Sequence, residues 1–412
     1  MAFPLSPARS LLLAFTLLLA SCNDGASPPA AGTGSSGVPV ATTPAYWPTS
    51  GWQTATPEAQ GFSTGALDAL AADAATSLPY HTSLLVIRNG WLVHESYHDT
   101  PSQTSGVDTQ HHVWSVTKSV TSLTLARAAS RGDITSIDVT AGDVFPAAAF
   151  GALPADDPRR AITLRHALQM RSGLAWNEPA WLLTLRDPML RLALGEFPDC
   201  SPSDDNRILC GVLHQDLAYT PGTVWNYNTY DSYLVSGFFR NLTGLRLDEY
   251  ANQHLFTPLG IVDPPTWTGL PAAYTFGGGL LRIRSRDLAK LGLLVQYNGQ
   301  WEGTQLIDPA VLDLTLAPQG PGLVAAFDAG TGQPSGTVGT DIAYGLQWWR
   351  ATGPAMGGLA SISARGLGGQ MLHIFRDKGL IVLITCDDDI TSDRETEINA
   401  FLKTHIVDRL LP

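Results

Sequence analysis

Residues 83–98 read SLLVIRNGWLVHESYH, and the dipeptide Asn89-Gly90 divides them into two apolar runs. Asn-Gly between two β-rich runs is the strongest short sequence signal for a two-residue hairpin turn. Residues 99–101, Asp-Thr-Pro, end the second run and leave little room for a helix. The stretch therefore predicts two antiparallel strands joined by a tight turn.

The second of these runs contains the pattern H-E-x-x-H at His94, Glu95 and His98. On a helix, the two histidines of this pattern hold zinc and the glutamate activates a water molecule. On a strand, the two histidines would lie about 13 Å apart, at about 3.3 Å per residue, and Glu95 would point to the other face. We favour the strand and expect no metal ion at these residues.

A second hairpin is predicted near the other end of the chain, where GQMLHIF and LIVLITC flank a turn at Asp377 to Gly379. The closing stretch DRETEINAFLKTHIVDRLL has a helical pattern. Further helical patterns occupy residues 63–76, 115–131, 163–171, 229–243 and 285–298. Helix and strand at both ends, with a helical middle, predict an α+β fold in which N- and C-terminal segments form one antiparallel sheet flanked by helices, with a mostly helical inserted subdomain.

Composition places the chain among globular proteins and excludes one class of partner. Hydrophobic residues make up 44% of the 412 residues, enough to bury a large core. The formal charge of −12 argues against nucleic-acid binding, which requires a basic face.

The N-terminus predicts export. Residues 1–21 contain an apolar run of about ten residues, which is too short to span a bilayer and fits a secretory signal. The ending Leu-Ala-Ser-Cys resembles a bacterial lipobox, so Cys22 is expected to carry acyl chains that anchor a lipoprotein to a membrane on the periplasmic or extracellular side. The alternative is an ordinary signal peptide with an incidental cysteine. Residues 22–46, rich in Gly, Ser, Pro, Ala and Thr, predict a flexible tether, and 47–412 the folded domain.

Three further cysteines follow Cys22. Cys200 and Cys210 bracket the polar stretch CSPSDDNRILC, where a short-range disulfide fits an exported protein. Cys386 ends an apolar run and is expected to be a buried thiol. The spacing does not match a zinc ribbon.

A candidate catalytic pair lies in WSVTKSVTS, where Ser115 and Lys118 are three residues apart at the start of a predicted helix and share a face. A serine hydroxyl is a weak nucleophile and needs a base beside it. A lysine can serve as that base where burial and the positive helix end disfavour its charge. The same helix end offers a backbone N–H to a developing oxyanion. The alternative is a capped, solvent-facing helix start.

Several motifs in order resemble the serine hydrolases related to class C β-lactamases. This family includes penicillin-binding proteins, β-lactamase-like esterases and 6-aminohexanoate-dimer hydrolases. The resemblance covers most of residues 52–410 and rests on WQTATPEAQGF, WSVTKSVTS, ITLRHALQMRSGLAW, PGTVWNYNT, GGGLLRIRSRDLAKLG, YGLQWW and RGLGGQ.

The resemblance implies a mechanism with no metal or organic cofactor. Ser115 would be the nucleophile and Lys118 its S-x-x-K partner. Tyr227, six residues after Pro221, matches the general-base tyrosine of the family. The N–H groups of Ser115 and Leu367 would bind the oxyanion.

Two departures from the family pattern bear on the substrate. The family's Tyr-x-Asn is Tyr227-Asn228-Thr229 here, and its Lys-Thr-Gly is Ala364-Arg365-Gly366. The lysine that family members use for a substrate carboxylate is therefore missing. The residues that we expect to line an acyl pocket are Trp114, Trp176, Thr229, Trp348, Trp349 and Gly366. For the aromatic residues among them, the alternative is packing in the core.

We therefore expect a membrane-anchored serine hydrolase that acts on small carboxylic esters or amides through an acyl-enzyme. One alternative is a β-lactamase or a D-alanyl-D-alanine carboxypeptidase-like enzyme. Another is a tethered sensor that binds penicillin or peptidoglycan and does not turn over.

Overall fold

The computed structural model describes residues 40–176, 196–200, 206–268, 274–319, 325–327, 334–337, 342–351, 359–387 and 394–407. The chain divides between Gly37 and Val38 into two compact units, and all described residues belong to the second. The predicted signal peptide, Cys22 and the first part of the tether lie outside the described residues, so export and lipidation stay predictions.

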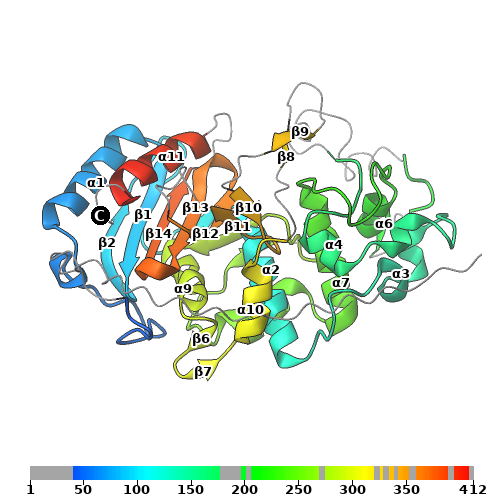
Figure 1. Cartoon of the computed structure of the whole chain (residues 1–412), viewed down its shortest axis with the longest axis horizontal. Helices are drawn as coiled ribbons and strands as arrows, with labels where there is room; N and C mark the ends of the chain where they lie inside the picture. The colour runs from blue at the N-terminus through cyan, green and yellow to red at the C-terminus, as the bar shows by residue number, and fades with distance from the viewer. Residues whose placement is uncertain are drawn as a thin grey trace, which may run out of the picture. The chain divides into compact units, whose positions relative to one another are not determined.

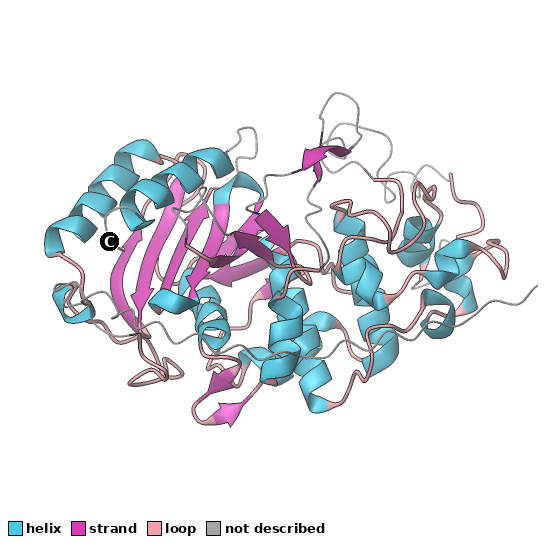
Figure 2. Cartoon of the chain, viewed as in Figure 1, coloured by secondary structure: helices cyan, strands magenta, loops and turns pink. Residues whose placement is uncertain are grey.

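A seven-stranded sheet forms the centre of the fold, with strand order β10-β11-β12-β13-β14-β1-β2 (Figures 1 and 2). Every neighbouring pair is antiparallel. The two N-terminal strands lie beside the five C-terminal ones, which confirms the predicted fold class. The strands are β1 (His81–Arg88), β2 (Trp91–Tyr97), β10 (Ile342–Tyr344), β11 (Trp349–Ala351), β12 (Ser361–Gly366), β13 (Gln370–Phe375) and β14 (Leu380–Cys386).

Both predicted hairpins are confirmed. Asn89 and Gly90 adopt φ angles of 51° and 87°, the left-handed pair that a tight turn between right-twisted strands requires. At the second hairpin, a short 3-10 helix, η8 (Arg376–Lys378), leads to Gly379 at φ 59°. This second turn places β13 against β14, and β14 then pairs with β1.

Helices cover both faces of the sheet. Helices α1 and α11 lie side by side on one face (Figure 1), where Leu70 and Phe401 pack with Leu84 and Val86 of β1. Helices α2 and α9 pack on the other face, against alternate residues of β1 such as Leu85. The helices are α1 (Thr64–Ser77), α2 (Val116–Arg131), α3 (Ala141–Val144), α4 (Leu164–Leu168), α6 (Arg207–Leu213), α7 (Thr229–Thr243), α8 (Leu247–Ala251), α9 (Ser285–Gln296), α10 (Pro309–Leu316) and α11 (Arg394–Leu402).

The remaining strands form small sheets. A three-stranded sheet has the order β3-β5-β4 and leads directly into the start of α2. Two hairpins, β6-β7 and β8-β9, complete the set. Their bounds are β3 (Gln110–His112), β4 (Thr266–Trp267), β5 (Leu281–Arg284), β6 (Gln300–Trp301), β7 (Thr304–Gln305), β8 (Ala325–Phe327) and β9 (Pro334–Thr337).

The H-E-x-x-H stretch lies on β2 and just after it, as the strand interpretation predicts. Glu95 forms two short hydrogen bonds with the guanidinium of Arg286 on α9, at 2.7 and 2.5 Å, and accepts a third from the Tyr97 hydroxyl. These donors hold the pKa of the Glu95 carboxyl below its usual value, although burial acts in the opposite direction. Glu95 therefore links the edge strand β2 to helix α9.

The folded unit begins earlier than the predicted boundary at residue 47. Ala41 donates its N–H to the Asn89 side chain at 3.0 Å, and the Tyr46 hydroxyl donates to the carbonyl of Gly90, also at 3.0 Å. Pro44 lies so close to Gly90 that a Cβ there would be 2.8 Å from the proline Cβ. Residues 40–46, which we predicted as tether, thus pack on the first hairpin. Their composition of small and polar residues hides these contacts, because one backbone N–H, one proline and one tyrosine make them.

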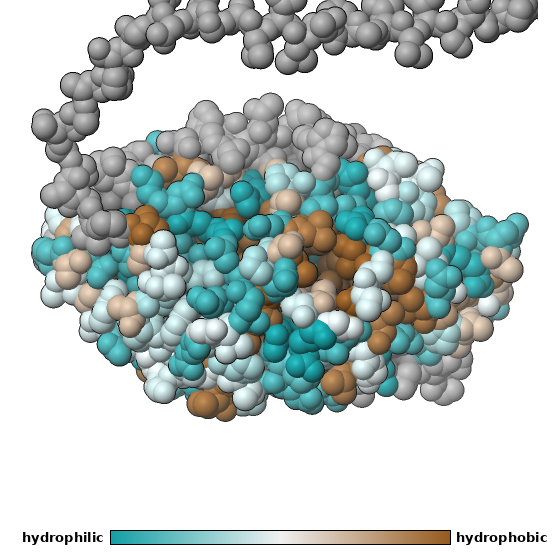
Figure 3. Space-filling model, turned by 60° about the horizontal axis from the view of Figure 1, so that its bottom comes forward, coloured by the Kyte–Doolittle hydropathy of each residue, from teal (hydrophilic) through white to brown (hydrophobic). Residues whose placement is uncertain are grey.

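Figure 3 shows one face of the molecule, mostly hydrophilic, with apolar residues gathered around a hollow near its middle. Large apolar side chains that the described residues expose include Val262, at 89%, and Leu367, at 39%. Leu367, a predicted oxyanion residue, therefore lies where solvent can reach it.

Among the helices of the described residues, none combines the length and the apolar character needed to cross a bilayer.

We predict that Gly90→Ala destabilises the protein more than Gly303→Ala. Both glycines occupy the second position of a two-residue turn, at φ 87° and 76°, so both variants suffer backbone strain of about 1–2 kcal/mol. Only Gly90 faces a neighbour, Pro44, and forcing that contact should cost about 1–3 kcal/mol more. Urea unfolding measures both losses. Equal losses, or no recovery when Pro44→Gly is added to Gly90→Ala, would show that residues 40–46 do not pack as described.

Candidate active site

The start of α2 places Ser115 and Lys118 together. Trp114, at φ 46°, turns the chain from β3 into the helix, and Ser115 is the residue before its first turn. Val116 and Val120 are buried in the core and fix the rotation of the helix. The Lys118 Nζ then lies 2.9 Å from the Ser115 Oγ, as the three-residue spacing predicts.

Lys118 joins three segments of the chain. Its side chain is only 1% exposed, and Nζ donates to Ser115 Oγ at 2.9 Å, Thr229 Oγ1 at 3.0 Å and the carbonyl of Gly278 at 2.8 Å. An amino group that carries three protons can satisfy three such acceptors. The buried amine therefore connects α2, the start of α7 and the loop before β5.

Tyr227 lies against the same amine. The Lys118 Nζ is 5.0 Å from the centre of its ring. Asn228 caps α7 by accepting the N–H of Tyr230 at 2.9 Å, so Tyr227 ends the loop and Thr229 begins the helix. The structure thus brings Tyr227 and Thr229 to Lys118 and its partner Ser115, although more than a hundred residues separate the two pairs in the sequence.

The end of β12 touches the segment before Ser115. A Cβ on Gly366 would lie 2.4 Å from the carbonyl oxygen of Val113, so any larger residue would push the two backbones apart. Leu367 follows and opens a short 3-10 turn, η7 (Leu367–Gly369). The contact between Gly366 and Val113 thus joins the two segments that lead into Leu367 and Ser115, the two predicted oxyanion donors.

A group of aromatic side chains surrounds Tyr227, and the sequence analysis missed most of it. Trp349 stacks on Tyr227 with ring centres 5.7 Å apart and planes 28° apart. Trp225 and Tyr344 contact both rings and are 5% and 6% exposed. The Arg365 guanidinium lies over Trp349 at 5.6 Å. The aromatic content of PGTVWNYNT and YGLQWW was the available signal, but neither motif shows that the two stretches meet.

The other tryptophans predicted to line the pocket differ in their neighbours. Trp348 is 1% exposed and belongs to the main core, which does not fit a side chain that lines a substrate pocket. Its neighbour Trp349 faces Tyr227 because successive residues of an extended chain point to opposite sides. Trp114 lies against His112 at 4.1 Å, and Trp176 packs edge-on against Tyr230 in the core.

Gly278 is a second site residue that the sequence analysis did not identify. A Cβ there would lie 2.7 Å from the carbonyl oxygen of Thr229 and 2.8 Å from its Cγ2. The missing side chain lets the Gly278 carbonyl reach Lys118. The run of glycines in GGGLL marked a close approach of backbones, but it did not reveal which partner approaches.

The cysteines are arranged as predicted from their spacing. The structure links Cys200 and Cys210 in a disulfide, with Cα atoms 5.7 Å apart. Cys386 is a buried thiol, and burial raises its pKa. Cys200, Cys210 and His214 are also the one group of His, Cys, Asp and Glu residues within the described ranges whose ligand atoms lie close enough to share a metal ion.

The fold and this arrangement define a protein of the β-lactamase class. The model of the β-lactamase family matches residues 81–404, and the chain belongs to this family. Comparison with curated proteins finds no significant match.

Solved structures with the same fold include hydrolases and a penicillin-binding protein. A Bacillus anthracis protein assigned as a 6-aminohexanoate-dimer hydrolase aligns with a TM-score of 0.64 and 19% identity, over 87% of this chain and 86% of its own. EstCE1, a hydrolase with promiscuous acyltransferase activity, aligns at 0.60 and 16%, over 82% and 98%. A penicillin-binding protein from Bacillus halodurans aligns at 0.57 and 16%, over 80% and 97%. At these identities the likeness shows the fold.

We predict that Gly278→Ala costs about 1–3 kcal/mol of stability, because its Cβ would force Thr229 away from the loop that carries the Gly278 carbonyl. Gly279→Ala is the matched control, since its nearest neighbour would lie at an ordinary 3.4 Å. Urea unfolding should show a change of less than about 1 kcal/mol for the control, because Gly→Ala at an unstrained loop position acts mainly by restricting the unfolded chain. Equal stability of the two variants would contradict the close approach at Lys118.

Proposed function

We propose that the protein is a serine hydrolase that forms an acyl-enzyme on Ser115 and acts on small carboxylic esters or amides. The observation that carries this proposal is the 2.9 Å contact between the Ser115 Oγ and the buried Lys118 Nζ at a helix start. A core serine has no need of such a partner, and a serine nucleophile does.

In the acylation step, the Ser115 oxygen attacks the substrate carbonyl carbon and the hydroxyl proton leaves to a base. In the neutral form, which burial favours, the Lys118 amine keeps two N–H donors for Thr229 Oγ1 and the Gly278 carbonyl, and its lone pair can accept the proton of Ser115. The Lys118 Nζ lies 5.0 Å from the centre of the Tyr227 ring, which supports a part for the Tyr227 phenol in the same proton transfer. Tyr227 would then donate its phenolic proton to the leaving alcohol or amine as the carbonyl–heteroatom bond breaks, and the phenolate would take back the proton that Lys118 holds.

The developing oxyanion requires two donors. The backbone N–H of Ser115 points out of the first turn of α2, where the helix dipole favours negative charge. Leu367 would supply the second N–H, because Gly366 holds the end of β12 against Val113. In the deacylation step, water attacks the ester carbon of the acyl-enzyme, loses a proton to the same base and releases the carboxylic acid.

The strand that carries Ala364-Arg365-Gly366, in place of the family's Lys-Thr-Gly, supports an uncharged substrate. Ala364 is completely buried and pairs with Leu372, so its position offers neither a cation nor room for one without repacking. The guanidinium of the next residue, Arg365, lies over Trp349 and donates to Ser363 Oγ at 3.0 Å. The names of the structural neighbours, a hydrolase with promiscuous acyltransferase activity and a protein assigned as a 6-aminohexanoate-dimer hydrolase, fit an ester or amide substrate.

We predict that Ser115→Ala abolishes hydrolysis of aryl esters while the protein stays folded. The change removes the nucleophile, and a residue at a helix start contributes only about 1 kcal/mol to stability. The measurement is p-nitrophenyl butyrate turnover, together with intact-mass detection of a single adduct from a fluorophosphonate probe on the wild type.

Ser119→Ala is the matched control for this variant, because Ser119 lies on the same helix but its hydroxyl donates to the carbonyl of Gln347. It should keep the adduct and the turnover. Turnover retained by Ser115→Ala would overturn the nucleophile assignment. An adduct with a single burst and no steady state would favour the non-turnover sensor.

We predict that kcat/KM for an aryl butyrate exceeds that for a chromogenic cephalosporin by at least tenfold. A β-lactam carboxylate lacks the lysine partner at position 364, and one missing charge-assisted hydrogen bond costs about 1.5–3 kcal/mol, or roughly ten- to a hundredfold. Parallel assays at one enzyme concentration provide the comparison. A higher value for the cephalosporin would move the protein toward the β-lactamases and give Arg365 the carboxylate-binding part.

A further inference from the structure

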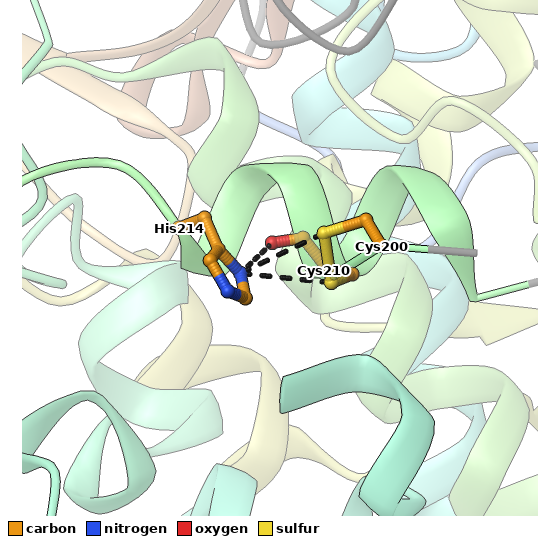
Figure 4. A group of neighbouring side chains, drawn as sticks. All are labelled: Cys200, Cys210 and His214. Atoms are coloured by element: carbon orange, nitrogen blue, oxygen red, sulfur yellow. Dashed lines mark hydrogen bonds between the residues drawn. A yellow bond between two sulfur atoms is a disulfide. The ribbon is translucent and has the colours of Figure 1, made fainter. Parts of the chain in front are cut away.

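Two sulfur atoms and an imidazole nitrogen, from residues that take no part in the group around Lys118, meet beside α6 (Figure 4). Cys210 lies on α6, and His214 follows one turn later at the end of that helix. The His214 Nδ1 lies 3.7 Å from the Cys200 Sγ and 3.5 Å from the Cys210 Sγ. Both cysteines are buried, at 4% and 0% exposure.

We propose that, when the Cys200–Cys210 disulfide is reduced, the two sulfurs and His214 Nδ1 bind a thiophilic divalent cation of the Zn²⁺ type. The disulfide and the metal would then be alternative cross-links at the same place. Each would join residue 200 to α6, one under oxidising conditions and the other under reducing conditions.

The distances to the imidazole already fit such an ion. Zinc bonds of about 2.3 Å to sulfur and 2.0–2.1 Å to nitrogen, at tetrahedral angles, place sulfur and nitrogen about 3.6 Å apart. The two observed distances, 3.5 and 3.7 Å, lie on either side of that value. Only the sulfurs must move, to a separation of about 3.8 Å, and rotation about the Cα–Cβ bonds supplies that movement once their bond is broken. Water would complete the fourth position.

The surroundings keep the imidazole turned toward the sulfurs. A Cβ on Gly151 would lie 3.0 Å from His214 Cε1, so the glycine leaves just enough room for the ring. The Phe197 ring lies 5.8 Å away, centre to centre. These neighbours position the ring before any metal arrives, and a held ligand loses less entropy on binding.

The hydrogen bonds of His214 permit the change. Nδ1 lies 2.9 Å from the carbonyl oxygen of Cys210, to which it donates when protonated. Metal binding would require the other tautomer, with the proton on Nε2. The Cys210 carbonyl would keep a partner, because the backbone N–H of His214 also donates to it at 2.9 Å. No buried acceptor would therefore be abandoned, whereas the proton would move to Nε2, a buried nitrogen for which the described residues offer no hydrogen-bond partner, so the metal–ligand bonds must outweigh its burial.

The chemistry balances with a dithiol as the reductant. Two electrons and two protons from the dithiol convert the disulfide to two thiols, and the dithiol becomes a disulfide. Binding of the cation then releases the two thiol protons, because the ligands are thiolates. Reoxidation would reverse the sequence and expel the metal.

Cobalt titration tests the proposal, since Co²⁺ occupies zinc sites and its spectrum reports thiolate ligands. The full chain carrying Cys22→Ala is reduced with a phosphine, desalted without oxygen and titrated with Co²⁺. We expect one ion per chain, thiolate-to-metal charge-transfer absorption, the visible bands of tetrahedral cobalt, and displacement by Zn²⁺. The oxidised protein should bind none, and zinc should raise the Tm of the reduced protein alone.

Variants separate the proposed ligands from other residues. His214→Ala should weaken zinc binding by at least tenfold and leave the oxidised Tm nearly unchanged, with His214→Gln as the substitute if alanine prevents folding. Cys386→Ala should leave the spectrum unchanged. Absence of stoichiometric cobalt in the reduced wild type, or a reduced chain that stays unfolded with zinc, would overturn the proposal. Unchanged binding in both His214 variants would do the same.

Discussion

The buried amine of Lys118 is the interaction on which the candidate site depends. Its three hydrogen bonds end on a side chain of α2, a side chain of α7 and a backbone carbonyl of the loop before β5. Removing any one segment would leave a buried polar nitrogen with an unmet bond, which costs about 1–3 kcal/mol. The lysine therefore sets the mutual positions of segments that are far apart in the chain, besides any part it takes in proton transfer.

Helix α2 carries further bonds of the same kind, and together they make it the element from which the site is built. Its hydroxyl groups donate to backbone carbonyls of neighbouring segments: Ser119 to Gln347, Ser122 to Leu346 and Thr121 to Gly277. Because the hydroxyls are buried and satisfied, the loop before β11 and the glycine loop are fixed in register with the helix. The preference of this helix for Ser and Thr, which are poor helix formers, follows from that use.

Local signals in the sequence were sufficient for the sheet and most helices. Asn89-Gly90 and Asp377 to Gly379 carry their turn conformations in their own residues. The helices predicted at 163–171 and 229–243 each begin after a polar capping residue, Thr163 or Asn228. The start of the domain and the aromatic group were not predictable in this way. Pro44 meets Gly90, and Trp225 meets Trp349, only through tertiary contact. The spacing of Ser115 and Lys118 is local, whereas the other two acceptors of the Lys118 amine, Thr229 and Gly278, are far away in the sequence.

The departure from Lys-Thr-Gly has a physical consequence that strand geometry makes clear. Ala364 faces the core beside Leu372, while Arg365, one residue on, pairs with Met371 on the opposite face. The positive charge of this strand therefore does not point toward the core side that packs on α2. It lies over Trp349, and Trp349 in turn stacks on Tyr227. A guanidinium over an indole contributes about 0.5–1 kcal/mol or more when shielded from water, enough to favour one ring orientation. Arg365 thus positions the aromatic group that backs Tyr227, where the family's lysine would contact the substrate itself.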